Sequence, residues 1–162
     1  MSKYILQTVG DGSCSLVTLL NFCVFKNGKL PIKYRSKEYM ELLEECSGLA
    51  GPILYIKPAL DKLKLRYENC PKFRSMKKLK IWLNDNLLIG NQISFCMGHP
   101  RFNLHSILIT NYYKTTNKYK VFNAQLYTKT NTIEYLTFKE ILGWGKHNLR
   151  LVCELNKIIK EK

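Results

Sequence analysis

Hydrophobic residues in the first half of the chain follow helical patterns. Residues 14–25, CSLVTLLNFCVF, are apolar on nearly every side and follow a possible cap at Ser13, which predicts a buried helix. Capped or amphipathic helices are expected over 36–46, 58–65 and 75–84, with residues 66–73 extended between the last two. The expected apolar set of the 75–84 helix is Met76, Leu79, Ile81, Trp82 and Leu83.

The second half changes to the alternation and β-branched runs that are typical of strands. Strands are expected over 92–97, 105–113, 118–123, 133–136 and 149–155, with one short capped helix over 137–144. Asn117 marks a hairpin turn. Helices followed by neighbouring strands predict an α+β fold, in which N-terminal helices pack on an antiparallel sheet. At 162 residues, the chain is expected to form a single domain over 1–162.

Composition narrows the class of protein. Hydrophobic residues make up 46% of the chain, but no apolar run is long enough to span a membrane and no secretory signal is evident, so we expect a cytoplasmic protein. The six cysteines form no C-x-x-C pair and no cluster with zinc-ligand spacing. We therefore expect reduced thiols, mostly in the core, with no metal and no cofactor.

The net charge of +14 points to possible partners. The chain has 26 Lys and Arg against 12 Asp and Glu, and such a field attracts nucleic acid or acidic protein surfaces. A solvated lysine-rich surface is the simpler interpretation. No recognition module with interleaved aromatic residues is visible.

Cys14 is the candidate nucleophile. It follows the turn Gly10-Asp11-Gly12-Ser13 and opens the first predicted helix. A thiol attacks as the thiolate, and the free N–H groups and dipole of a helix N-terminus favour that anion. The simpler interpretation is a core cysteine in the first turn of a buried helix.

Three histidines could supply the base, and His105 is preferred because it opens a strand next to a loop. His99 is expected in that loop and His147 in solvent. Asn123 ends the strand that should pair with the His105 strand, so its amide could orient the imidazole. Gln7 is a candidate donor to an oxyanion, together with the Cys14 backbone N–H.

The order Gln7, Cys14, His105, Asn123 resembles the papain-like clan of cysteine peptidases, especially its bacteriocin-processing branch and related bacterial and phage domains. The resemblance covers nearly the whole chain: GDGSCSLVTLLNF is similar to the nucleophile segment, HSILITNYYKTTNKYKVFNAQ to the base and orienter strands, and YLTFKEILGWGKHNLRLVCEL to the closing helix and strand. It implies a papain-like fold, with Gln7 as oxyanion donor, Cys14 as nucleophile, His105 as base and Asn123 as orienter.

The resemblance implies a cysteine hydrolase that cleaves a peptide, isopeptide or amide bond of a protein or peptide substrate through a thioester. An amine acceptor in place of water would make it an acyltransferase. The motif DGSC also resembles the nucleophile segment of ovarian-tumour-type deubiquitinases. The alternative from another class is a catalytically degenerate basic binding module that engages nucleic acid or an acidic protein.

Overall fold

The computed structural model describes residues 14–47, 56–70, 72–97, 105–122, 133–143 and 152–159. Its helices are α1 (Cys14–Asn27), α2 (Lys37–Ser47), α3 (Lys57–Lys62), α4 (Met76–Leu88) and α5 (Phe138–Leu142). Its strands are β1 (Tyr67–Asn69), β2 (Gln92–Met97), β3 (His105–Tyr113), β4 (Lys118–Phe122), β5 (Ile133–Thr137) and β6 (Val152–Ile158). The predicted α+β class is confirmed, as is each predicted element, with shifts of a few residues at some ends.

The strands form one sheet in the order β1-β6-β2-β3-β4-β5, and every neighbouring pair is antiparallel. The strand β6, the last of the described strands, therefore lies between β1 and β2. It ends at Ile158, three residues beyond the predicted end, because Ile158 pairs with Tyr67 on one side and Gln92 on the other. The side chain of Ile158 is buried, although the preceding residues Asn156 and Lys157 are polar.

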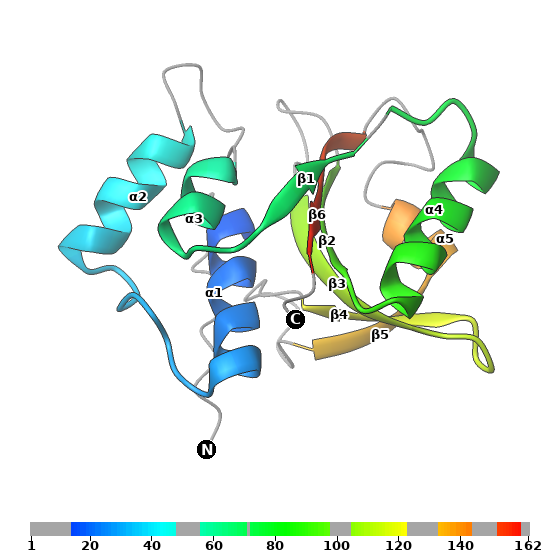
Figure 1. The fold of residues 1–162 in the computed structure, drawn as a ribbon, viewed down its shortest axis with the longest axis horizontal. Coiled ribbons are helices and arrows are strands. Elements are labelled where there is room, and N and C mark those ends of the chain that lie inside the picture. The colour runs from blue at the N-terminus through cyan, green and yellow to red at the C-terminus, as the bar shows by residue number, and fades with distance from the viewer. Residues whose placement is uncertain are drawn as a thin grey trace.

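Both faces of the sheet are covered by helices (Figure 1). On β3, Leu108 packs with α1, α2 and α3, whereas its neighbours Ile107 and Ile109 pack with α4 and α5. On β4, Val121 and Phe122 divide in the same way. Successive side chains of a strand point to opposite faces, so this alternation builds two cores, one on each side. The expectation that the N-terminal helices cover the sheet describes only one of these two layers.

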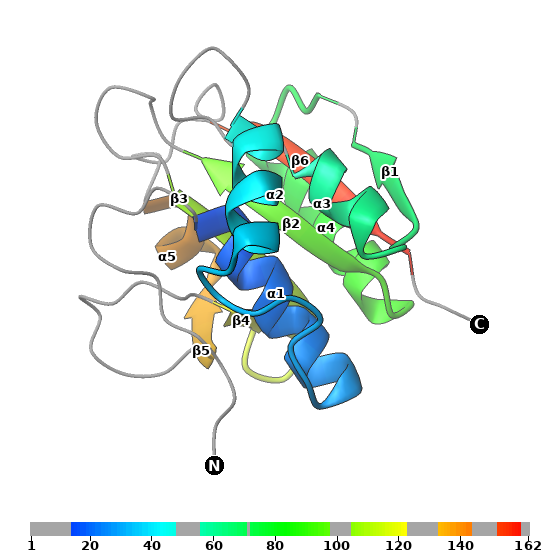
Figure 2. The same cartoon turned by 90° about the vertical axis from the view of Figure 1, so that its left-hand side faces the viewer.

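Helix α1 is enclosed between the sheet and the α2–α3 pair, as Figure 2 shows. Its described side chains from Leu19 to Val24 are all buried, including the polar Asn21. This enclosure explains the absence of a clear polar face in its sequence, because a helix buried on all sides needs none.

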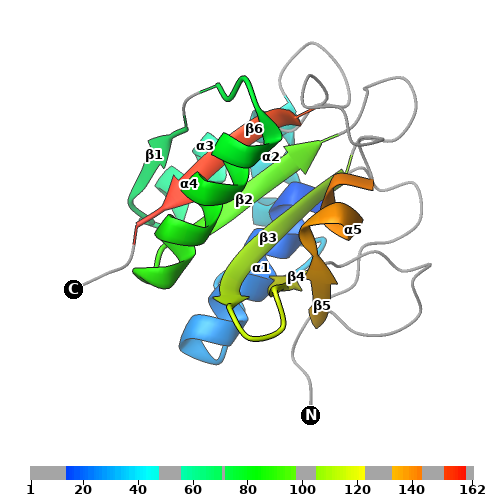
Figure 3. The same cartoon turned by 90° about the vertical axis from the view of Figure 1, so that its right-hand side faces the viewer.

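Helix α4 covers the opposite face beside α5 (Figure 3). It extends four residues beyond its predicted end, since Leu87 is buried and Asn86 forms buried hydrogen bonds. The Asn86 Nδ2 donates to the Trp82 carbonyl at 2.9 Å, and its Oδ1 accepts from Asn91 Nδ2 at 3.2 Å. Of the expected apolar set of this helix, Leu79 and Leu83 are buried in the core, whereas half of the surface of Ile81 is exposed.

Side-chain caps fix several helix starts. Ser75 accepts a hydrogen bond from the Lys78 N–H and Ser36 from the Tyr39 N–H, as the sequence predicts for both serines. Thr137 and Glu140 form a reciprocal capping box at α5. The N–H and hydroxyl of Thr137 hydrogen-bond with Glu140 and lower the pKa of its carboxyl group. Within the described ranges, no helix combines the length and apolar character needed to cross a bilayer.

Two leucines of α4 test the second core. Leu83 is fully buried whereas 48% of Leu88 is exposed, so we expect Leu83→Ala to lower the free energy of unfolding by about 2–5 kcal/mol. Leu88→Ala, the matched control, should change it by less than about 1 kcal/mol. Urea unfolding monitored by circular dichroism measures both, and equal effects would contradict the proposed packing of α4.

Candidate functional site

Cys14 is the first residue of α1, as the sequence predicts. The first turn of this helix contains no acidic side chain that would oppose an anion. Leu16, two residues later, is buried in the core between α1 and the sheet. The position of Cys14 is therefore set by a helix that is held in place by packing, rather than by a surface helix.

His105 is the first residue of β3, again as predicted. Its Cα pairs with that of Met97, the last residue of β2. The ladder between β2 and β6 shifts at Cys96 and Met97. Such irregularities bend strands and re-aim side chains, and they are frequent beside active sites. The backbone at His105 therefore lies where regular pairing of the sheet is interrupted.

Antiparallel pairing brings the carboxyl end of β4 to the amino end of β3. Phe122, the last residue of β4, pairs with Leu108, which is three residues after His105. Asn123 follows Phe122 directly in the sequence. Both Asn123 and Gln7 lie outside the described residues, so their predicted roles stay predictions, and the same holds for His99 and His147.

Helix α1 packs on β3, and the two elements share one core through Leu16, Leu19, Leu20 and Leu108. Figures 1 and 3 show the amino-terminal ends of α1 and β3 at the same end of the molecule. The fold therefore places the two backbone positions that carry Cys14 and His105 at the same end of the sheet. These positions form the candidate active site, at the end of the sheet where β2 and β4 also terminate.

The two residues are 105 − 14 = 91 positions apart along the chain, so only the tertiary fold can bring them to one end of the sheet.

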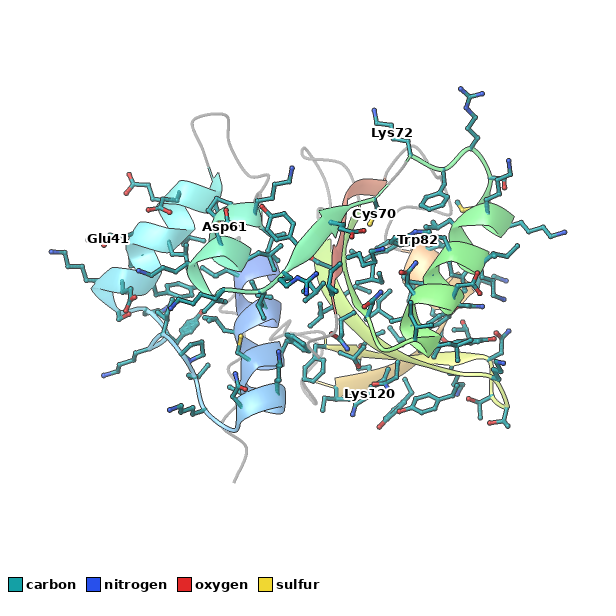
Figure 4. All side chains as sticks on the ribbon, viewed as in Figure 1. Glu41, Asp61, Cys70, Lys72, Trp82 and Lys120 are labelled. Atoms are coloured by element: carbon teal, nitrogen blue, oxygen red, sulfur yellow. The ribbon has the colours of Figure 1, made fainter. Side chains whose placement is uncertain are left out.

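Three other cysteines, Cys23, Cys46 and Cys70, have surroundings that suppress thiol chemistry. Burial raises the pKa of the Cys23 thiol to about 11, partly opposed by Lys26. Burial likewise raises the pKa of the Cys70 thiol to about 12, and the nearby Lys157 only partly offsets this. Cys46 is buried in the core of α1, α2 and α3. Figure 4 shows Cys70 on the segment that follows β1. These three cysteines are core or boundary residues, as the composition predicts.

Metal-ligating side chains do not gather in the described part of the chain. No group of three or more His, Cys, Asp or Glu residues there could hold a metal ion. The charged groups are instead spread over the surface. Recorded ion pairs include Lys62 with Glu38 at 3.5 Å and Lys157 with Glu68 at 2.9 Å.

The outward surface of α4 was missed at the level of sequence. The sequence groups Ile81 with Leu79 and Leu83 in one apolar set, but Ile81, Leu88 and Ile89 are all substantially exposed. The spacing of Ile81 and Leu88, seven residues apart, could have revealed them as one helix face pointing away from Leu79 and Leu83. These residues form a surface distinct from the candidate active site.

Comparison with known proteins adds no family to this description. No protein-family model and no curated protein sequence matches the chain. The resemblance to papain-like peptidases therefore stays a prediction, which depends on Cys14 and His105 and on the placement of their backbones.

The raised thiol pKa values predict a loss of stability in alkali. Free thiols in the unfolded chain ionise near pH 9.0, whereas Cys23 in the folded protein ionises only near pH 11. Its contribution is therefore complete below pH 9 and is lost as the pH rises to about 11. Over this interval, the free energy of unfolding should fall by up to roughly 3 kcal/mol on account of Cys23. Urea unfolding at several pH values measures the slope.

The Cys23→Ala variant should show a shallower dependence of unfolding free energy on pH, even though the substitution itself costs stability. Thr115→Ala, at an exposed turn position, is the control and should keep the original slope. Identical slopes for Cys23→Ala and the unchanged protein would contradict a buried, protonated thiol at this position.

Proposed function

We propose that the protein is a cysteine hydrolase of papain-like architecture, with Cys14 as nucleophile and His105 as general base. The observation that carries the proposal is the placement of these residues. Cys14 is the first residue of a buried helix, and that helix packs on the strand whose first residue is His105. A nucleophile at the start of a helix and an imidazole at the start of the strand beneath it are the two parts that thiol catalysis requires.

The environment of α1 supports an ionised thiol. Free N–H groups and the helix dipole stabilise an anion at a helix N-terminus, and no acidic side chain in the first turn opposes this effect. A neighbouring imidazole accepts the thiol proton and remains as a cation beside the thiolate. Packing of α1 between the sheet and α2–α3 keeps the helix start in a fixed position, which reduces the cost of orienting the two groups.

In the proposed reaction, the Cys14 thiolate attacks the carbonyl carbon of the substrate and forms a tetrahedral adduct. His105, as imidazolium, donates its proton to the leaving nitrogen, so the C–N bond breaks and a thioester remains. A water molecule then gives a proton to His105 and attacks the thioester carbon. The C–S bond breaks, and the thiolate and imidazolium are restored with release of a carboxylic acid.

Two further residues complete the proposal. Asn123 would accept a hydrogen bond from the imidazole and fix its orientation, because it directly follows β4, whose last residue pairs with β3 near His105. Gln7 and the backbone N–H of Cys14 would donate hydrogen bonds to the oxyanion. Hydrolysis of a peptide, isopeptide or amide bond is the proposed outcome, and the ovarian-tumour-type resemblance of DGSC favours a protein substrate within the same chemistry.

Thiol labelling tests the nucleophile directly. Treated with iodoacetamide at neutral pH, Cys14 should react at least roughly tenfold faster than Cys23, Cys46 and Cys70, because these three thiols are buried or have raised pKa values. Tandem mass spectrometry of digested protein assigns the modification to each cysteine. This assignment matters because Cys14 and Cys23 lie in one tryptic peptide.

The His105→Ala variant tests the base. It should slow the labelling of Cys14 by roughly tenfold or more, since the thiol loses its proton acceptor. His147→Ala is the matched control and should leave the rate unchanged, with circular dichroism confirming that both variants fold. Labelling of Cys14 at the rate of Cys70, or equal rates in the two histidine variants, would overturn the assignment.

A further inference from the structure

The outward side of α4 exposes large aliphatic side chains. The exposed fractions are 50% for Ile81, 48% for Leu88 and 67% for Ile89, although α4 has a well-covered inner side built on Leu79 and Leu83. Ile81 and Leu88 are two turns apart on one side of the helix, and Ile89 caps its carboxyl end. Exposed aliphatic groups gathered in this way are a feature of protein interaction surfaces.

Cations adjoin these aliphatic side chains. Arg74, Lys77 and Lys78 are exposed at the start of α4, and Lys77 and Lys78 lie one turn before Ile81. Residues 72–84 contain five Lys and Arg residues and no Asp or Glu, and the exposed Asp85, one turn after Ile81, is the one acidic residue of α4. Within the part of the chain that the structure describes, none of the recorded ion pairs involves Arg74, Lys77 or Lys78. Their charge is therefore available to a partner.

Helix α2 lies on the other side of the molecule and is acidic. Helix α2 contains four glutamates and one lysine. Figure 4 shows Glu41 of α2 at the opposite side from Trp82 of α4. The cations at the start of α4 therefore lie away from the glutamates of α2.

We propose that the α4 face, defined as Arg74, Lys77, Lys78, Ile81, Leu88 and Ile89, binds an acidic amphipathic segment of a partner protein. Carboxylates of the partner would meet the cations at the start of the helix, and its apolar side chains would cover the aliphatic groups farther along. This inference does not depend on the proposed hydrolase activity, because α4 covers the sheet face opposite to α1.

The aromatic residues beside the cations favour protein over nucleic acid. Phe73 and Trp82 contact each other with ring centroids 5.3 Å apart, and both pack on the core beneath α4. They are therefore engaged with the protein rather than presented as platforms for stacked bases. A phosphate backbone would also leave Ile81, Leu88 and Ile89 without an apolar partner. A second copy of the chain is disfavoured because two molecules with a net charge of +14 repel each other.

Fluorescence anisotropy of the full chain tests the α4 face. The probes are a fluorescein-labelled amphipathic peptide of leucine and glutamate, the same peptide with serine replacing leucine, and labelled oligo(dT). The leucine–glutamate peptide should bind most tightly. Lys77→Glu/Lys78→Glu should weaken this binding by roughly tenfold, and Ile81→Ser/Ile89→Ser by roughly fivefold.

The matched control is Lys29→Glu/Lys33→Glu, which makes the same change of net charge at exposed positions of the α1–α2 connection. It should bind the leucine–glutamate peptide as the unchanged protein does. Equal weakening by the control would overturn the α4 face and indicate attraction by net charge alone. Tighter binding of oligo(dT), unaffected by the isoleucine substitutions, would assign the surface to nucleic acid instead. Self-association in sedimentation velocity that Lys77→Glu/Lys78→Glu abolishes would assign it to a second copy.

Discussion

The fold depends on the burial of β3 and β4 from both sides. Each strand must place apolar side chains alternately on two faces, so Leu108 contributes to the core beneath α1 while Ile107 and Ile109 contribute to the core beneath α4. A shift of one residue in the pairing of β3 would exchange the two sets of side chains and disturb both cores at once. The register of this central strand is therefore strongly specified, and so is the position of its first residue relative to the neighbouring strands.

The fixed register of β3 also fixes the backbone position of the candidate base. His105 is held at the start of a strand that cannot slip, and Cys14 is held at the start of a helix that is enclosed on all sides. Proximity of two reactive groups is effective only where their supports are rigid. The α4 face differs from these positions, because its side chains are exposed and contribute little to either core. The sheet thus lies between the layer that contains Cys14 and the layer that contains α4.

Much of the fold could be predicted from the sequence because its patterns are local. Helix caps at Ser36 and Ser75, the turn at Asn117 and the β-branched run of β3 each indicate structure within a few residues. The starts of α1 and β3, and hence the positions of Cys14 and His105, follow from such signals.

Other features depend on distant partners and could not be predicted. The placement of β6 between β1 and β2 is a matter of tertiary pairing, and Ile158 is buried only because of it. The exposure of Ile81 does not follow from composition, since α4 has apolar residues on both its inner and outer sides, and only the spacing of Ile81 from Leu88 distinguishes the two sides. The placement of Cys14 and His105 at one end of the sheet likewise depends on the packing of α1 on β3 rather than on either segment alone.

The position of β6 also bears on how the chain acquires its structure during synthesis. Residues 67–69 join the sheet only through residues 152–158, and those residues emerge from the ribosome after every other described strand. Until β6 is made, the edge of β2 that β6 covers is unpaired. The strand β1, which follows α3, also has no partner in the sheet until then. The insertion of β6 between β1 and β2 requires contacts between remote parts of the chain, and such contacts form slowly. A nascent chain would therefore carry an unpaired strand edge until residues 152–158 had been made, and such an edge is prone to pair with other molecules.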